Sequence, residues 1–207
     1  MEVLKLLAIA VGGYLLGSVS LSIFLSKKVF GSDVRSKGSG NAGATNMARV
    51  YGMMAGVLTL AADMLKAVLA MWIGSLIAGD VGFSLAGAAC MLGHCFPVFH
   101  GFKGGKGVSV GGAVSLMIDW RVGLLVVGTF LVLALLSRKV SLGSICGAIA
   151  AGVGAVIFHV STPRLLLALL CMTVVVVRHS ENIRRLIRGE EPDFKPGKRP
   201  HGESGAK

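Results

Sequence analysis

Long apolar blocks separated by short polar segments dominate the pattern of this 207-residue chain. A stretch of about 20 apolar residues is enough to cross a bilayer as an α-helix. Six blocks are long enough to be predicted as membrane helices. A seventh has about two-thirds of the length that a perpendicular span needs, and a short, broken span of this kind usually lines a polar cavity. The predicted spans are Val3–Leu25, Met53–Ala78, Gly82–Phe99, the short Gly107–Ile118, Val122–Ser137, Leu142–His159 and Leu165–Val177.

The distribution of lysine and arginine predicts how these helices are oriented. Alternate connecting segments, counted with the C-terminal segment, hold seventeen of these residues on one side and two on the other. Basic loops stay in the cytoplasm, so we expect the N-terminus outside and the C-terminus in the cytoplasm. The alternation holds only if Gly107–Ile118 is a crossing. The sequence thus predicts an all-α, polytopic membrane bundle of seven transmembrane helices over residues 1–189, followed by a disordered cytoplasmic tail over 190–207.

Composition supports lipid as the solvent and excludes several other classes of protein. Hydrophobic residues make up 54% of the chain and charged residues 15%, against about 25% charged in soluble domains. The net charge of +11 is explained by cytoplasmic basic loops, so no nucleic-acid partner is expected. Four cysteines lie in apolar stretches without CxxC spacing, and no third ligand lies near His94 or His100 in the sequence. We therefore expect neither a disulfide framework nor a metal site.

The first polar segment with a composition that packing does not explain runs over residues 36–49. Its small residues allow close approach of the backbone to a ligand. Its hydroxyl and amide side chains offer hydrogen bonds, and its arginine can hold an anion in a bidentate manner. These side chains are Ser39, Asn41, Thr45, Asn46 and Arg49. The alternative is a flexible Gly/Ser loop whose arginine only marks the topology.

The second segment, residues 93–109, contains a glycine-rich turn that opens directly into the short helix. Free backbone amides and the positive end of a helix favour a phosphate group. The turn is not a Walker A loop, because the lysine is followed by glycine and not by serine or threonine. Its residues are Lys103, Gly104, Gly105, Lys106 and Gly107. An ordinary basic cytoplasmic loop is the alternative.

The third segment, residues 178–191, continues the last span. On a helix, Arg178, His179 and Asn182 would share one face, and the arginines that follow could instead lie on anionic lipid. Ser141 and Ser144 lie where the sixth predicted span begins, on the same side, where they can cap the helix or bind an anion.

Two charged residues lie within the second span. Asp63 and Lys66 are three residues apart, and because intramembrane charges are costly we expect them to form a structural ion pair.

Three stretches in this order resemble the motifs of one enzyme family. They are Ser39-Gly-Asn-Ala-Gly-Ala-Thr-Asn-Met-Ala-Arg49, Gly93-His-Cys-Phe-Pro-Val-Phe with Phe102-Lys-Gly-Gly-Lys-Gly107, and His179-Ser-Glu-Asn182-Ile. The family is that of the bacterial acyl-phosphate:glycerol-3-phosphate acyltransferases, the PlsY family. The resemblance covers nearly the whole chain, except for the tail after about residue 192.

The resemblance implies an enzyme of the bacterial plasma (inner) membrane with its active site at the cytoplasmic face. Such an enzyme transfers a fatty acyl group from acyl phosphate to the 1-hydroxyl of glycerol 3-phosphate, giving lysophosphatidic acid and phosphate. It needs no cofactor and no metal, and it uses neither acyl-CoA nor acyl carrier protein directly. Its partners are the two substrates and membrane lipid. It is linked functionally to an enzyme that forms acyl phosphate and to a 1-acylglycerol-3-phosphate acyltransferase.

We assign roles to the residues accordingly. Ser39, Arg49, His179 and Asn182 form the expected catalytic set, with either His179 or a substrate phosphate as the proton acceptor. Substrate and phosphate binding is assigned to Asn41, Thr45, Asn46, Lys103, Gly104, Gly105, Lys106, Gly107, Ser141 and Ser144. Structural roles are assigned to Glu181, which is expected to pair with an arginine, and to Asp63 and Lys66. An organic-anion or phosphate transporter and a noncatalytic membrane subunit are the alternative functions.

Overall fold

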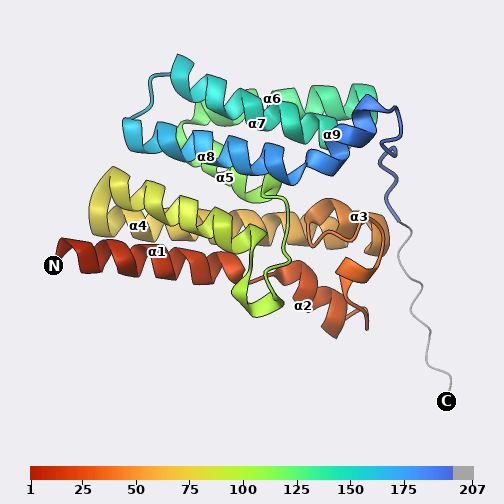
Figure 1. Ribbon diagram of the computed structural model, residues 1–207, viewed down its shortest axis with the longest axis horizontal. Coiled ribbons are helices and arrows are strands. Elements are labelled where there is room, and N and C mark those ends of the chain that lie inside the picture. The colour runs from red at the N-terminus through yellow and green to blue at the C-terminus, as the bar shows by residue number, and fades with distance from the viewer. Residues whose placement is uncertain (198–207) are drawn as a thin grey trace.

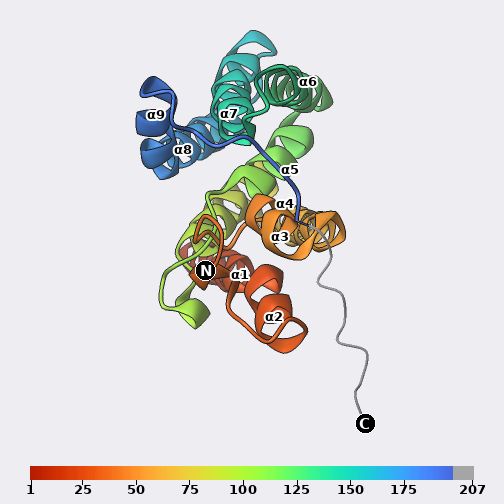
Figure 2. The ribbon, with the colours of Figure 1, turned by 90° about the vertical axis from the view of Figure 1, so that its right-hand side faces the viewer.

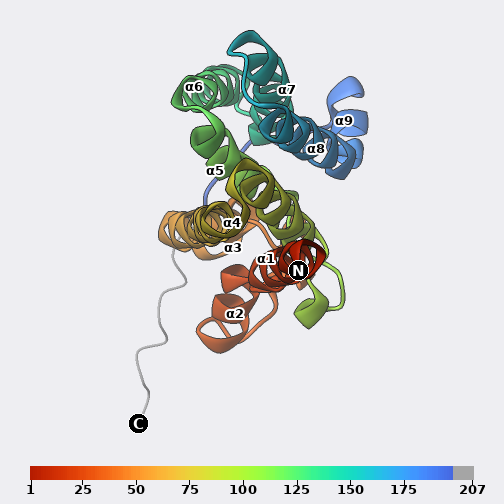
Figure 3. The same cartoon turned by 90° about the vertical axis from the view of Figure 1, so that its left-hand side faces the viewer.

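The computed structural model describes residues 1–197, and every regular element in this part of the chain is a helix. Two groups of helices lie side by side, α1–α4 and α6–α9, with the short α5 between them (Figure 1, Figure 2 and Figure 3). The elements are α1 (Glu2–Ser18), α2 (Leu21–Lys28), the 3-10 helix η1 (Val34–Ser36), α3 (Ala44–Tyr51), α4 (Met53–Cys95), the 3-10 helix η2 (Val98–His100), α5 (Val108–Ile118), α6 (Trp120–Ser137), α7 (Val140–Ile157), α8 (Thr162–Arg178) and α9 (Ser180–Ile187).

The first predicted span consists of two helices. Val19 has an extended backbone, and the Ser20 hydroxyl caps α2 by accepting a hydrogen bond from the amide of Ile23. The break leaves the Val19 carbonyl available, and the Lys66 ammonium donates to it at 2.8 Å. An apolar run therefore continues across a real interruption of the helix, which the hydrophobic pattern alone does not show.

Helix α4 is a hairpin that contains the second and third predicted spans. Its backbone leaves the helical region at Ala78 and Gly79, with φ of +55° at the glycine. The two arms touch closely, because a Cβ added to Gly82 would lie 2.1 Å from the Gly74 carbonyl oxygen. The turn forms at the predicted connection that holds no lysine or arginine, and Figure 1 shows it at the same end of the molecule as the N-terminus.

Lengths and compositions of the helices agree with a membrane protein. Within residues 1–197, four helical stretches are long and apolar enough to cross a membrane, and the bent pair α8–α9 makes a fifth. One of the four is the α4 hairpin, which holds two predicted spans. Helix α5 is shorter, with 11 residues. Large apolar side chains are exposed along the helices, as on α6, where Leu136 is 80% exposed.

The segment after α9 differs from the expected disordered tail. Residues 190–197 run from α9 past α7 to α3, as the dark blue chain in Figure 2 shows. The Glu191 side chain is buried, and the backbone amides of Phe194 and Gly197 donate to the carbonyls of Arg138 and Ala48. These contacts hold the segment against the helices. The remainder of the predicted tail, 198–207, lies outside the described residues.

Candidate active site

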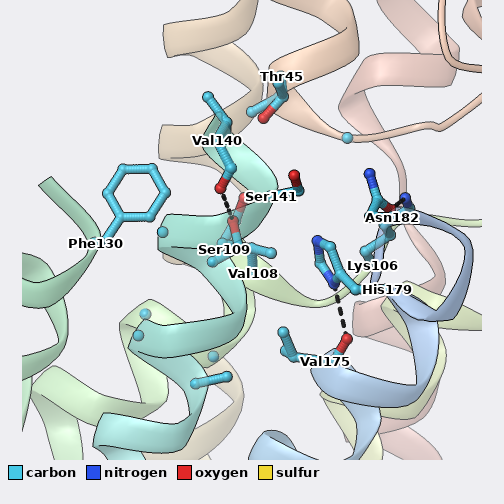
Figure 4. Close-up of a pocket in the computed structure, with 18 of the residues that line it drawn as sticks. Thr45, Lys106, Val108, Ser109, Phe130, Val140, Ser141, Val175, His179 and Asn182 are labelled. Atoms are coloured by element: carbon cyan, nitrogen blue, oxygen red, sulfur yellow. Dashed lines mark hydrogen bonds between the residues drawn. The ribbon is translucent and has the colours of Figure 1, made fainter. Parts of the chain in front are cut away.

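One cavity of about 920 Å³ brings together segments that lie far apart in the sequence. It lies between α3, the first arm of α4, and helices α5 to α9 (Figure 4). The predicted site residues that line it are Ser39, Asn41, Thr45, Asn46, Arg49, Lys106, Ser141, Ser144, His179, Glu181 and Asn182. A large part of its wall is apolar and includes Leu60, Met64, Leu116, Val126, Phe130, Leu131 and Met172. A charged group and an apolar chain can therefore occupy the same cavity.

Arg49 is the cationic side chain that α3 contributes. Glycine and alanine allow α3 to pack closely on α4, since a Cβ at Gly56 would lie 2.6 Å from the Ala48 Cβ. The next residue, Arg49, lines the cavity and is half-buried. Among the described residues its guanidinium has no carboxylate within ion-pair distance. A partly buried arginine without an anionic partner suits an anionic ligand.

Asn46 organises the loop before α3, which differs from its predicted role as a substrate ligand. Its Oδ1 accepts from the Ser39 amide at 2.9 Å. Its Nδ2 donates to three carbonyls, those of Val34 at 3.1 Å, Lys37 at 3.0 Å and Asn41 at 2.9 Å. The residue is 2% exposed. Its hydrogen-bonding groups are therefore occupied by the loop, and it holds Ser39 and Asn41 in place at the cavity.

Asn41 has the opposite environment. Its Oδ1 is buried at the cavity wall and has no hydrogen-bond partner within residues 1–197. A buried acceptor without a donor is costly, so this atom is suited to a donor supplied by a ligand.

The glycine-rich turn packs closely on the end of α4, and the amides of two of its glycines bond within the protein and are not free for phosphate. The amide of Gly104 donates to the Cys95 carbonyl at 3.2 Å and that of Gly105 to the His94 carbonyl at 3.1 Å. A Cβ at Gly105 would lie 2.1 Å from Nε2 of His94. Gly107 begins α5 with a φ of +84°, a conformation that favours glycine. The glycines let the turn lie directly on the end of α4.

The two lysines of this turn point to different places. Lys103 is exposed and does not line the cavity. Lys106 enters the cavity, where its ammonium donates to Oδ1 of Asn182. Burial, followed by the nearby charge of Arg185, lowers the pKa of Lys106 below its ordinary value. Of the two, Lys106 is the one positioned to meet a ligand.

A buried carboxylate that the sequence does not single out completes this corner of the cavity. Glu191 Oε1 accepts from the Ser141 hydroxyl at 2.6 Å and from Asn182 Nδ2 at 2.7 Å. Its Oε2 accepts from Arg185 Nε at 2.7 Å. Burial raises the pKa of Glu191, but these three hydrogen bonds outweigh it and the pKa lies below its ordinary value. In the sequence Glu191 is one charge in a polar run, and Arg185 is one of several basic residues, so no signal marks either.

From the sequence, Glu181 is predicted to pair with an arginine. In the structure Glu191 makes that pair, with Arg185. Glu181 lines the cavity and is exposed, and it makes no ion pair within residues 1–197.

His179 lies where the last span ends and the chain bends by 58° into α9. Its Nδ1 lies 2.8 Å from the Val175 carbonyl oxygen. A carbonyl can only accept, so Nδ1 carries the proton and Nε2 keeps a lone pair. Burial lowers the pKa of His179 to about 4, against the opposing effect of that hydrogen bond. Figure 4 shows the free ring nitrogen facing the space between Ser141 and Asn182.

The bend separates residues that were expected to share a face. Arg178 turns away from the cavity, donates to the Gly105 carbonyl at 3.2 Å and lies over the Phe96 ring at 5.2 Å. It connects the end of α8 to the glycine-rich turn, while His179 and Asn182 remain at the cavity.

The two serines of α7 also differ from each other. Ser141 is bound to Glu191, as described above. The Ser144 hydroxyl donates to the Val140 carbonyl at 2.9 Å, and its oxygen is left with free acceptor capacity at the cavity wall.

The predicted intramembrane ion pair is present and includes a third residue. Lys66 Nζ lies 2.8 Å from Asp63 Oδ1, and His94 Nδ1 lies 3.4 Å from the same oxygen. The Lys66 ammonium is also 3.2 Å from His94 Nδ1. Because the His94 ring packs against Gly105, the cluster supports the turn that carries Lys106.

Comparison with known proteins places this architecture in a family. A family model described as glycerol-3-phosphate acyltransferase matches residues 7–189. A glycerol-3-phosphate acyltransferase of Geobacillus kaustophilus is 41% identical over 187 residues, which cover 90% of this chain and 95% of that protein. One of Syntrophotalea carbinolica is 42% identical over 188 residues, covering 88% of this chain and 94% of the relative.

Two solved structures have the same fold. The crystal structure of PlsY, an integral membrane glycerol 3-phosphate acyltransferase, in its glycerol 3-phosphate form superimposes with a TM-score of 0.87 and 36% identity over 92% of this chain and 96% of that one. The lysophosphatidic acid form gives 0.85 and 35% over 92% and 95%. The predicted family and the prediction of a helical membrane protein are confirmed. The chain belongs to the glycerol-3-phosphate acyltransferase family.

Proposed function

We propose that this protein transfers a fatty acyl group from acyl phosphate to the 1-hydroxyl of glycerol 3-phosphate, forming lysophosphatidic acid and phosphate. The observation that carries this proposal is one cavity whose wall combines cationic and hydrogen-bonding residues with a large area of apolar side chains. The solved relatives in glycerol 3-phosphate and lysophosphatidic acid forms support the same acceptor and product.

Arg49 and Lys106 bind the phosphate groups in this proposal. Arg49 lies on α3 and Lys106 on the turn before α5, and both line the same cavity, so a dianion between them is held by two cations. Thr45 and Ser39 add hydroxyls on the α3 side, and Ser144 adds one on the α7 side. Each substrate brings one phosphate group; one becomes free phosphate and the other stays in the product. A site with cations on more than one wall suits two such groups.

The reaction needs little covalent chemistry from the protein. Acyl phosphate already carries a good leaving group, so the acceptor hydroxyl can attack the acyl carbonyl directly, and no enzyme nucleophile is required. The protein positions the two substrates and stabilises the charge that develops on the carbonyl oxygen. When the C–O bond to phosphate breaks, the phosphate departs with the electron pair, and the hydroxyl proton passes to a nearby base.

Two groups are suited to orient the attacking hydroxyl. The neutral His179 ring has a free lone pair on Nε2 toward the cavity, and the buried Oδ1 of Asn41 has no donor among residues 1–197. Each can accept the hydroxyl hydrogen bond, and Nε2 or a phosphate oxygen of the bound substrate can take the proton.

The site lies at the membrane surface in our proposal, with seven spans, the N-terminus outside and the active site facing the cytoplasm of a bacterial plasma membrane. The acceptor then arrives from water, and the acyl chain lies along the apolar wall. An enzyme that forms acyl phosphate supplies the donor, and a 1-acylglycerol-3-phosphate acyltransferase consumes the product. A membrane-impermeant thiol reagent should label Ser161→Cys in intact cells and Ser36→Cys only after the cytoplasmic face is exposed. The reverse pattern contradicts this topology.

The activity is tested with purified protein, an acyl phosphate and labelled glycerol 3-phosphate. We expect lysophosphatidate with acyl phosphate and none with acyl-CoA. Arg49→Ala should lower kcat/KM by about 100-fold or more, whereas Arg184→Ala, at an exposed arginine outside the cavity, should not. Absence of product together with flux of the anion across protein-containing vesicles would identify a transporter instead.

A further inference from the structure

The chain after α9 crosses from one helical group to the other beside the cavity. Glu191 and Pro192 line the cavity, Asp193 pairs with Lys139 at 3.2 Å, and the Gly197 amide donates to the Ala48 carbonyl at 3.0 Å. We call residues 190–197 the strap. It joins α9, the start of α7 and α3, the three elements that carry most of the polar residues of the cavity (Figure 2).

Glu191 is the strap residue whose side chain is buried beside the site. It is 7% exposed, and both carboxylate oxygens accept hydrogen bonds. Its neighbours Glu190 and Asp193 are exposed. Removing a carboxylate from water costs free energy, which hydrogen-bond donors must offset. Here the donors are Ser141 on α7 and Asn182 and Arg185 on α9.

The consequence concerns the orientation of the Asn182 amide. Its Nδ2 faces the Glu191 carboxylate, so its Oδ1 faces the Lys106 ammonium. Figure 4 shows Asn182 and Lys106 side by side. Rotating the amide by half a turn would place its oxygen against the carboxylate and its NH₂ against the ammonium. Both contacts would then be repulsive, so the two charged residues together fix one orientation.

We propose that Glu191 is a positioning residue of the active site, which holds the Asn182 amide and, through it, the Lys106 ammonium in the place where substrate phosphate binds. This inference rests on the proposed function. The inference adds to the proposed active site a residue that lies outside the three motifs and belongs to the strap. Glu191 itself does not touch the reacting atoms.

A purely structural role makes a different prediction. If Glu191 only tied down the strap, removing it should act like removing Asp193, which ties the same strap to Lys139. It should then lower stability and leave the KM for glycerol 3-phosphate unchanged.

The first experiment compares three variants of the full-length protein: Glu191→Ala, Glu191→Gln and the matched control Asp193→Asn. Glutamine keeps an oxygen for Ser141 and Asn182 and loses only the ion pair to Arg185, whose side chain is 37% exposed and can turn to water. We expect Glu191→Ala to raise the KM for glycerol 3-phosphate by roughly 10- to 100-fold with a smaller loss of kcat. Glu191→Gln should stay within about tenfold of the wild-type KM, and Asp193→Asn within about threefold.

Melting temperatures of all three variants are measured alongside, so that loss of the fold is recognised. If Glu191→Ala does not fold, Glu191→Gln and the shorter Glu191→Asp decide the matter. Glu191→Asp cannot reach all three donors and should have the higher KM of the two. Equal KM values in these two variants, or equal effects of Glu191→Ala and Asp193→Asn, overturn the proposal.

A double-mutant cycle tests whether Glu191 acts through Asn182. We expect Glu191→Ala/Asn182→Ala to be no worse than Asn182→Ala within about threefold, because the residue to be positioned is already absent. Effects that multiply show independent roles and overturn the inference. The wild-type protein separates this outcome from a failure of the proposed function: if it forms no lysophosphatidate, the function fails, whereas an active wild type with an unaffected Glu191→Ala refutes the positioning role alone.

Discussion

Replacing Asn46 by alanine should loosen the loop before α3 without changing the rest of the protein. The side chain makes four hydrogen bonds to this loop, and the one to the Val34 carbonyl is buried. A buried acceptor left without a donor costs about 1–3 kcal/mol, and each partly exposed bond contributes about 0.5 kcal/mol. The local loss is then about 3 kcal/mol, which corresponds to a roughly 100-fold shift in the opening of the loop.

Hydrogen exchange measured in detergent or nanodiscs reports this opening directly. In Asn46→Ala, the amide of Ser39 and its neighbours should exchange about 100-fold faster, while amides in α6 and α7 keep their wild-type rates. Activity should fall as well, because a misplacement of about 1 Å at a substrate-binding residue can cost about 100-fold in rate. Thr45→Ala is the matched control for hydrogen exchange, and it should leave the exchange of the Ser39 amide unchanged. Thr45 lines the cavity next to Asn46, and its side chain makes no hydrogen bond within residues 1–197.

The refuting result is a variant with raised KM and unchanged exchange. Asn46 would then contact the substrate, as the sequence suggested, and its hydrogen bonds to the loop would be exchanged for bonds to the ligand on binding.

Three further variants test the turn, the histidine and the intramembrane pair. Gly105→Ala should lower both kcat and the melting temperature, because its Cβ would lie 2.1 Å from a histidine ring nitrogen, whereas Gly128→Ala, with nothing within 4 Å, should change neither. Burial lowers the pKa of His179 to about 4, so the ring is neutral above about pH 5. A fall of kcat/KM on the acid side near pH 6 should therefore come from protonation of the substrate phosphate, and it should persist in His179→Gln. Loss of that fall in the variant contradicts this view. Lys66→Met leaves the Asp63 carboxylate buried without its ammonium partner and should destabilise the protein by about 3–5 kcal/mol, measured by unfolding; combining it with Asp63→Leu should recover part of the loss.

The pattern of apolar blocks and basic loops predicts most of the helices. It locates the turn of the α4 hairpin and the short α5, because a connection without lysine or arginine and a short span are visible in the sequence itself. The break at Val19 is not predicted, since the apolar residues continue through it and only a capping serine marks the new helix.

The sequence predicts which residues line the site better than it predicts what each of them does there. Arg49, Lys106 and His179 line one cavity, as three basic motifs on one face suggest. The glycines of the turn and Asn46 look alike in sequence whether they bind a ligand or hold a loop, and only their hydrogen bonds distinguish the two. Glu191 is hidden for another reason: its burial depends on where the strap runs, and no local pattern encodes that path.

The strap turns the arrangement of the chain into a closed ring. The backbone leaves α3 at Tyr51, passes through both helical groups around the cavity, and returns at Gly197 to the residue before Arg49. A fusion that replaces the strap, or a truncation at residue 189, opens this ring while leaving every membrane helix in place. An affinity tag intended to leave the catalytic machinery intact therefore belongs after residue 197, and a truncation at residue 189 gives a full set of helices with an incomplete site.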